Sequence, residues 1–188
     1  MKIWKFGAVA ERYDSLTPAD DYTYEELISF DGRSHKNDWA CKKVVPNINP
    51  KKNPKFGDYS ECMGVLVFSQ KAIEKLYDFI KDDVEILPLE CDYGDFSLIN
   101  VTTILDALDR EKSKFEVFKG SDRIMYVEKY AFFEEVVKGH DIFTLKDKSG
   151  TCIFASDRLV QTINQSKLKG FRFELVWDSE ESLEDASK

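Results

Sequence analysis

Residues 65–109 read VLVFSQKAIEKLYDFIKDDVEILPLECDYGDFSLINVTTILDALD, and this stretch decides the fold. It opens on four consecutive apolar residues, 65–68, a run that is typical of a strand covered on both faces. Ser69 follows as a predicted helix N-cap, because its hydroxyl can accept a hydrogen bond from an unpaired amide of the first turn. Apolar side chains then recur at helical spacing, at Ala72, Ile73, Leu76, Tyr77 and Ile80. The pattern predicts a buried strand followed by a capped helix.

Two further extended segments follow this helix. Residues 84–89 and 96–101 flank Asp92-Tyr93-Gly94-Asp95, which has the composition of a hairpin turn. Pro88 cannot donate to a sheet ladder, so we expect it at an edge or an irregularity. Thr102 or Thr103 is expected to cap a short helix over residues 104–110.

The C-terminal part of the chain repeats the plan of the central part. Residues 152–155 are apolar, Ser156 takes the N-cap position, and Gly170 is placed to end the helix in a left-handed conformation. Residues 171–176 then alternate as a half-buried strand does. Superposing Ser69 on Ser156 gives two strand–helix–strand units of equal length and low residue identity. Two explanations stay open: a duplication of one unit, and similar packing requirements in two unrelated units.

Weaker patterns predict the remaining elements. Strands are expected over residues 1–9, 39–45, 115–118, 124–127 and 141–145, a helical turn from Thr17-Pro18, a loop over 46–58 and a helix over 128–137. The predicted fold class is α+β, a single domain with a mixed or antiparallel sheet and short helices packed on it. Residues 1–59 supply N-terminal strands and loops of the same domain, 60–178 form its core, and 179–188 form an acidic, disordered tail.

The totals limit the classes of function. A chain of 188 residues is long enough for one sizeable domain. Its formal charge of −8 argues against direct nucleic-acid binding and against an anionic membrane surface, since both require excess Lys and Arg. An acidic surface instead steers basic partners. No signal peptide is apparent and no run approaches the ~20 apolar residues of a membrane helix, so we expect a cytoplasmic protein.

No catalytic or metal-binding motif stands out. Four cysteines are scattered without short spacings and only two histidines accompany them: Cys41, Cys62, Cys91 and Cys152, with His35 and His140. The chain has no P-loop, dinucleotide fingerprint, HExxH or G-x-S-x-G sequence. We therefore expect no catalytic residues, no cofactor and no metal. Two alternatives stay open: a small hydrolase or transferase with a site assembled from distant residues, such as His140 with Asp141, and a general protein-interaction module.

Tyrosines beside carboxylates suggest a protein interface, because the ring supplies an anchor and the acids supply charge complementarity. Two segments have this composition, and we take their residues as candidates for partner binding: Asp20, Asp21, Tyr22, Tyr24, Glu25 and Glu26 in the first, and Asp92, Tyr93 and Asp95 in the second. Tyrosines that cover the core with their hydroxyls in water explain the same composition without a partner.

A series of short blocks resembles the bacterial immunity proteins that accompany polymorphic toxins, a group first catalogued as a domain of unknown function. The blocks fall within residues 60–178: Phe68-Ser69, Leu87-Pro88-Leu89-Glu90, Asn100-Val101-Thr102, Leu105-Asp106-Ala107-Leu108-Asp109, Asp141-Ile142-Phe143-Thr144-Leu145, Ser156-Asp157-Arg158 and Gly170-Phe171-Arg172-Phe173. The resemblance implies a cytoplasmic inhibitor that binds a cognate toxin domain and has no catalytic residues of its own.

The resemblance also implies that its recurring residues are scaffold. Asn100 is expected to satisfy backbone groups at a strand end, and Arg158 to pair with a buried acid. The apolar scaffold positions are Leu87, Leu89, Leu105, Leu108, Phe143, Phe171 and Phe173. A nuclease is one toxin class that would suit an acidic inhibitor, because its basic cleft can be occupied by carboxylates in place of phosphates.

Overall fold

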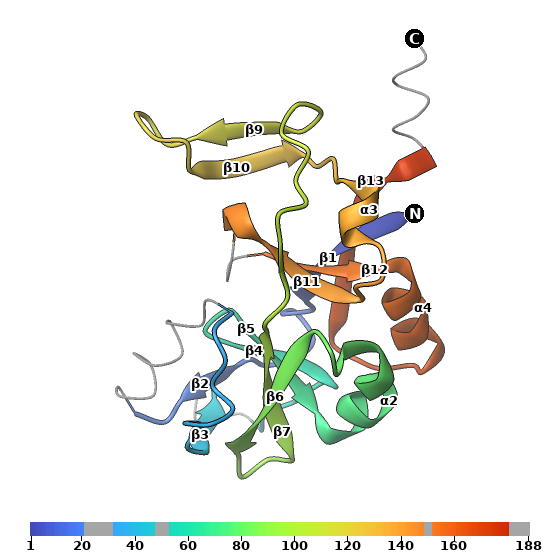
Figure 1. Ribbon diagram of the computed structural model, residues 1–188. Coiled ribbons are helices and arrows are strands. Elements are labelled where there is room, and N and C mark those ends of the chain that lie inside the picture. The colour runs from blue at the N-terminus through green and yellow to red at the C-terminus, as the bar shows by residue number, and fades with distance from the viewer. Residues whose placement is uncertain (21–31, 48–52, 149–151, 181–188) are drawn as a thin grey trace.

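Two units with the same order of elements form the body of the molecule (Figure 1). The structure is a computed structural model that describes residues 1–20, 32–47, 53–148 and 152–180. The first unit consists of β4 (Tyr59–Cys62), β5 (Val65–Ser69), helix α2 (Gln70–Ile80) and β6 (Val84–Glu90). The second consists of β11 (Ile142–Leu145), β12 (Ile153–Ser156), helix α4 (Asp157–Gln165) and β13 (Phe171–Asp178). Both predicted strand–helix–strand units are confirmed.

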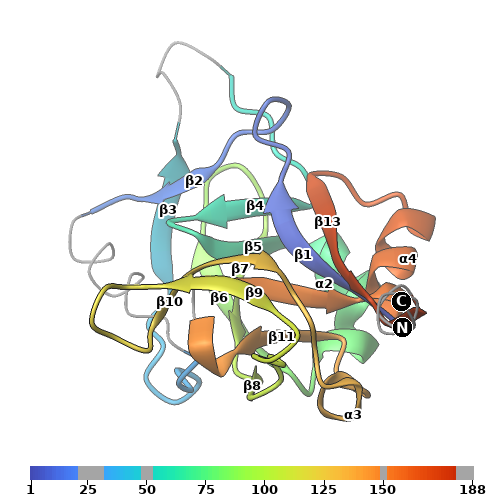
Figure 2. The same cartoon turned by 90° about the horizontal axis from the view of Figure 1, so that it is seen from above.

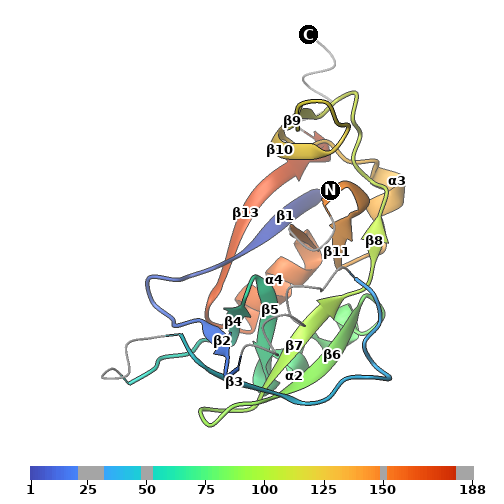
Figure 3. The same cartoon turned by 90° about the vertical axis from the view of Figure 1, so that its left-hand side faces the viewer.

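The two units also arrange their strands in the same order. β7 (Phe96–Val101) gives the order β4-β5-β7-β6, and β1 (Lys2–Ala8) gives β11-β12-β1-β13, with every neighbouring pair antiparallel. β7 follows β6 through the predicted hairpin turn, whereas β1 begins the chain and lies along β13 (Figures 2 and 3). The amide of Ser179 donates to the carbonyl of Met1 at 2.9 Å. The start of β1 and the end of β13 therefore occupy the place of the hairpin turn in the first unit.

Each unit begins with an aspartate that holds the N-cap of its helix. Ser69 and Ser156 accept from the amide three residues ahead at 3.2 and 3.1 Å, so both predicted caps are confirmed. The hydroxyl of Ser69 donates to the carboxylate of Asp58 at 3.1 Å, and that of Ser156 to Asp141 at 2.5 Å. The two serine amides donate to the carbonyls of the same aspartates at 2.9 and 3.0 Å. The two helix starts therefore share one hydrogen-bonding plan, although the aspartate precedes the serine by 11 residues in the first unit and by 15 in the second.

One hydrophobic core joins the two units. It takes buried side chains from both helices, among them Leu76, Ile80, Leu159 and Ile163. The ring centroids of Tyr59 and Phe171, one from each unit, lie 5.1 Å apart. Fully burying such a side chain contributes roughly 1.5–3 kcal/mol to the free energy of folding, so separating the units would cost several times that amount.

Two N-terminal strands close the first sheet into a barrel with the order β2-β3-β6-β7-β5-β4. They are β2 (Leu16–Pro18) and β3 (Lys42–Pro46), so the strand expected from residue 39 begins at Lys42. The prediction of a helical turn from Thr17 is wrong. Leu16 is buried inside the barrel, and pairing of its neighbours with β3 outweighs the local capping chemistry. The β3–β6 ladder begins only at Leu89, one residue after Pro88.

The prediction of a helix over residues 104–110 is also wrong. Ile104–Leu105 form the short strand β8, which runs parallel to β11. Beyond it, Leu108 forms a β-bridge with Phe132, and the amide of Asp109 donates to the carbonyl of Ala131 at 2.9 Å. Pairing with a distant segment therefore replaces the local helical bonds.

A two-stranded hairpin stands at the opposite end of the molecule from the barrel (Figure 1). It consists of β9 (Lys114–Val117) and β10 (Ile124–Lys129), as predicted. Because β10 runs to Lys129, the helix expected over residues 128–137 is reduced to α3 (Glu134–Val137). No helix in the described parts of the chain is long and apolar enough to cross a membrane.

The residues that the resemblance assigns to the scaffold lie inside the fold. Leu87, Leu89, Leu108 and Phe143 are buried, and Leu105, Phe171 and Phe173 are half-buried. The side-chain amide of Asn100 donates to the carbonyl of Arg33 at 2.7 Å, which is the backbone role expected of it.

Candidate partner-binding surface

The predicted acidic turn lies at the open end of the barrel, between β6 and β7. Asp92, Tyr93 and Asp95 are all exposed there, and Tyr93 is 55% exposed. The ring of Tyr93 lies 6.2 Å from that of Phe56, and the carbonyl of Asp95 accepts from the first amide of α2 at 3.0 Å. The turn is therefore held in one position while its carboxylates face solvent.

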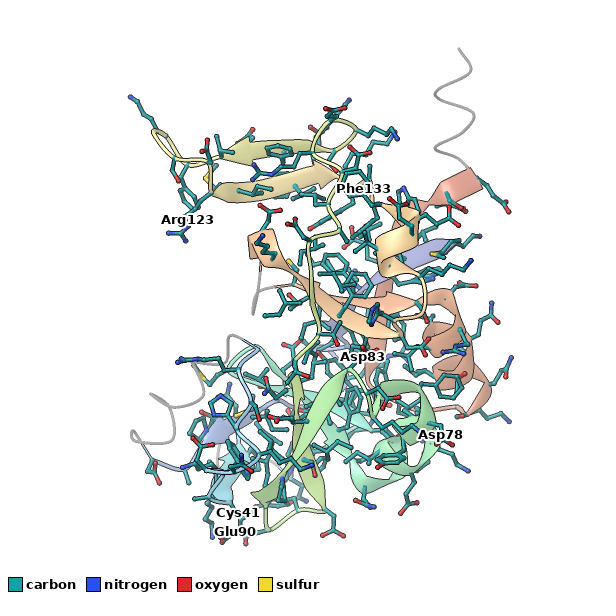
Figure 4. The ribbon with its side chains drawn as sticks, viewed as in Figure 1. Cys41, Asp78, Asp83, Glu90, Arg123 and Phe133 are labelled. Carbon is teal, nitrogen blue, oxygen red and sulfur yellow. The ribbon has the colours of Figure 1, made fainter. Side chains whose placement is uncertain are left out.

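The barrel brings the start of the other acidic segment to the same end. The amide of Ala19 donates to the carbonyl of Lys43 at 3.0 Å, which puts the exposed Asp20 beside β3. The ammonium of Lys43 lies 3.3 Å from Glu90 and 3.7 Å from Asp92, and its hydrogen bond to Glu90 together with the charge of Asp92 raises the pKa of Lys43. Figure 4 labels Glu90 at this end. The other residues of that segment, Asp21, Tyr22, Tyr24, Glu25 and Glu26, lie outside the described residues.

The hairpin of β9 and β10 carries an apolar surface that sequence reasoning missed. Four large apolar side chains of this hairpin are exposed, with 43–57% accessibility: Val117, Phe118, Met125 and Tyr126. Ile124 and Val127 on the same hairpin are buried against the body. A signal for this surface existed in the sequence. Each predicted strand contains consecutive apolar residues, and since neighbouring side chains of a regular strand point to opposite faces, some of them must face outward. The irregular register between Ile124 and Tyr126 leaves both Met125 and Tyr126 exposed.

His140 lies beside two acids at the seam between the units, as the enzymatic alternative requires. Its Nδ1 is 2.8 Å from Asp83, which Figure 4 labels at the seam. Asp83 also accepts from the hydroxyl of Thr103 at 2.8 Å and from the amide of Asp141 at 3.2 Å. An imidazole held by a carboxylate can act as a general base. The hydroxyl of Ser156 donates to the neighbouring Asp141 and accepts from the Leu159 amide, so it caps α4.

The other groups at this seam have structural partners. Asp141 is 3% exposed and accepts from Nε of Arg158 at 3.1 Å and from its Nη2, so the predicted pairing of Arg158 with a buried acid is confirmed. In the first unit, the ammonium of Lys71 lies 3.1 Å from Asp58. Lys71 comes two residues after Ser69, as Arg158 comes two residues after Ser156. The amide of Lys169, just after α4, donates to Asp58 at 2.8 Å, as the Asp141 amide donates to Asp83 after α2. The carboxylates therefore tie each unit to the helix end of the other.

The cysteines pack as separate free thiols. Burial raises the pKa of Cys62 to about 12, which leaves almost no thiolate at neutral pH. Within the described ranges, no three His, Cys, Asp or Glu side chains lie together as a metal site would require.

Comparison with known proteins adds the family. No curated protein matches the chain. A family model described as an immunity protein family (Imm11) matches residues 22–178, a range that includes every strand from β3 to β13 and so both units and the hairpin. Because this match covers well over half of the chain, and agrees with the short blocks that resemble bacterial immunity proteins, the chain belongs to the immunity protein family (Imm11).

Proposed function

We propose that this protein binds a cognate bacterial toxin domain and neutralises it by occluding its working cleft. The observation that carries the proposal is the family match over residues 22–178. The protein then acts in the cytoplasm as the antidote of a polymorphic toxin system, protecting the cell that makes the toxin. No cofactor takes part, because occlusion needs only a complementary surface.

A basic partner suits the charge of the chain. The formal charge is −8, and Asp20, Glu90, Asp92 and Asp95 gather at one end of the barrel with Lys43 among them. Carboxylates arranged on a rigid end can take the place of phosphates in a basic cleft. A nuclease is therefore the toxin class that the charge favours. In this proposal Asp21, Tyr22, Tyr24, Glu25 and Glu26 are candidates for binding the toxin together with Asp20, Asp92, Tyr93 and Asp95.

Co-expression tests the function directly. Cells that express the reading frame adjacent to this gene are expected to stop growing, and cells that express both proteins are expected to survive. A neighbour that is harmless alone, or that kills equally in the presence of this protein, would contradict the proposal.

The pair of His140 and Asp83 provides the control for the enzymatic alternative. Occlusion predicts that His140→Ala protects cells as well as the unaltered protein does, provided that the variant is folded by circular dichroism. Loss of protection by a folded His140→Ala variant that still binds the toxin would favour turnover instead.

The acidic turn should set the rate of association rather than the lifetime of the complex. Replacing Asp92 and Asp95 by Asn is expected to slow association about threefold at low salt and to flatten its salt dependence, because exposed charges act mainly by steering. Stopped-flow mixing with the purified toxin at several salt concentrations measures both effects. Unchanged association would remove this turn from the interface.

A further inference from the structure

The hairpin of residues 114–129 is a rigid arm. Ile124 and Val127 are buried in the core that β10 shares with the second sheet, so one face of the hairpin is fixed to the body. Arg110 lies over the ring of Phe115 at 5.4 Å and donates to the carbonyl of Asp122 at 3.0 Å. These contacts fix both ends of the hairpin, and a surface that is already ordered loses little entropy on binding.

Its outer surface is unusually apolar for this molecule. Eleven large apolar side chains are exposed among the described residues, and four of them belong to this one hairpin: Val117, Phe118, Met125 and Tyr126. Single exposed apolar residues are ordinary on a protein surface, but a concentration of them marks an interaction site. Figure 4 labels Arg123 near the tip of the hairpin, and its guanidinium lies 5.5 Å from the ring of Phe118. Tyrosine and arginine side chains are the usual anchors of protein interfaces.

Charge on the same surface indicates the chemistry of the occupant. Glu116 is the cross-strand neighbour of Tyr126, and Glu128 follows two residues later on the same face. All three line a hollow of about 480 Å³, and neither glutamate has an ion-pair partner among the described residues. Lys114 and Arg110 also line this hollow; Arg110 is paired with Asp147 at 2.9 Å, and Lys114 offsets one of the two carboxylates, so the hollow keeps a net negative charge. A net negative charge beside an exposed tyrosine fits an apolar pocket with a basic rim.

We propose that the 114–129 hairpin is the anchor by which this protein holds its toxin. The occupant is a toxin surface with an apolar pocket for Tyr126 and Met125, bordered by lysine or arginine side chains that face Glu116 and Glu128. This inference rests on the proposed function, since it takes the toxin as the partner. It assigns the long lifetime of the complex to the hairpin and leaves the acidic turn at the far end of the barrel to act through its charge.

The acidic turn and the hairpin differ in how many of their charged and aromatic groups already have partners within the protein. At the turn, Asp92 shares Lys43 with Glu90, and the ring of Tyr93 rests against Phe56. On the hairpin, Tyr126 is 57% exposed and neither glutamate beside it forms an ion pair within the described residues. A desolvated aromatic anchor contributes more to affinity than an exposed charge at a rim, so the hairpin should dominate dissociation.

The test measures dissociation of the purified product of the adjacent reading frame. The double variant Met125→Ala/Tyr126→Ala is expected to raise the dissociation rate constant about 30-fold in biolayer interferometry, the size typical of losing an interface anchor. Tyr77→Ala is the matched control, because Tyr77 is an exposed tyrosine on α2 with 51% accessibility, and it should leave the rate unchanged. Glu116→Gln/Glu128→Gln should slow association with a smaller effect on dissociation.

Each outcome decides between the proposals. Failure of the unaltered protein to bind the neighbour contradicts the proposed function. Binding by the unaltered protein that Met125→Ala/Tyr126→Ala leaves as tight as Tyr77→Ala overturns the hairpin while the function stands. If the double variant does not fold, hydrogen exchange on the unaltered complex replaces it: slowed exchange in residues 114–129 supports the anchor, and unchanged exchange overturns it. A dimer of this chain that the double variant dissociates would assign the hairpin to self-association and also overturn the proposal.

Discussion

Gly170→Ala is expected to lower the free energy of unfolding by about 2–5 kcal/mol. Gly170 has a φ of +94°, which an alanine reaches only with about 1–2 kcal/mol of strain. An added Cβ would also lie 2.4 Å from the carbonyl oxygen of Tyr59. The neighbouring backbone has little freedom to withdraw, because the amides of Asp58 and Tyr59 both donate to the carbonyl of Lys169, at 2.7 and 3.0 Å. Relieving such an overlap costs roughly a further 1–3 kcal/mol.

Urea titration followed by circular dichroism measures this loss, and Gly120→Ala is its control. Gly120 has a similar φ of +77° in the turn between β9 and β10, but nothing lies within 4 Å of the Cβ that would be added. It should therefore lose only the conformational term of about 1–2 kcal/mol. Equal losses at the two positions would show that the approach of Gly170 to Tyr59 contributes nothing to stability.

Asp141→Ala is expected to lower the free energy of unfolding by about 2–3 kcal/mol. The carboxylate of Asp141 is buried and accepts from the hydroxyl of Ser156 and from the guanidinium of Arg158. Its removal leaves the hydroxyl that caps α4 without its second partner and removes the strong, charge-assisted bonds. The loss stays below that of a wholly buried pair because the side chain of Arg158 is 67% exposed and can be hydrated.

Two other aspartates make this prediction specific. Asp58→Ala should cost a comparable amount, since Asp58 holds Ser69 and Lys71 in the first unit as Asp141 holds Ser156 and Arg158 in the second. Asp106→Ala should leave stability close to that of the unaltered protein, because Asp106 and Lys146 form a pair in which both side chains are 70% exposed. If Asp106→Ala destabilised the protein as much as Asp141→Ala, burial of the carboxylate would not be the cause.

The recurrence of one hydrogen-bonding plan at low residue identity has a physical basis. Each unit needs an acceptor at the start of its hairpin, a serine before its helix and a cation two residues later, supplied by Asp58, Ser69 and Lys71 in the first unit. The rest of each unit needs only apolar side chains of suitable size. Repeated topology therefore persists where few identities remain, and it does not by itself separate duplication from convergence.

The sequence by itself determined the features that depend on neighbours in the chain. The caps at Ser69 and Ser156 and the turn at residues 92–95 follow from local backbone chemistry, and the periodicity of apolar residues follows from which face must be buried. The series of short blocks likewise indicated the immunity protein family, since recurring scaffold residues keep their order and spacing. The prediction that Gly170 ends its helix is wrong: α4 ends at Gln165 and Lys167 takes the left-handed position after it, whereas Gly170 lies further along, where its positive φ serves the close approach to Tyr59.

Only the tertiary structure decided the features that depend on distant partners. Thr17-Pro18 and residues 104–110 carry helix-start chemistry, yet pairing with β3, β11 and residues 131–132 makes them extended. The placement of β1 beside β13, the link from Asp83 to Asp141, the approach of Asp20 to the turn at residue 92 and the outward face of the hairpin all join segments far apart in sequence. The physical reason is that local propensities differ by less than about 1 kcal/mol per residue, whereas burial and pairing with distant segments contribute more at each of these positions.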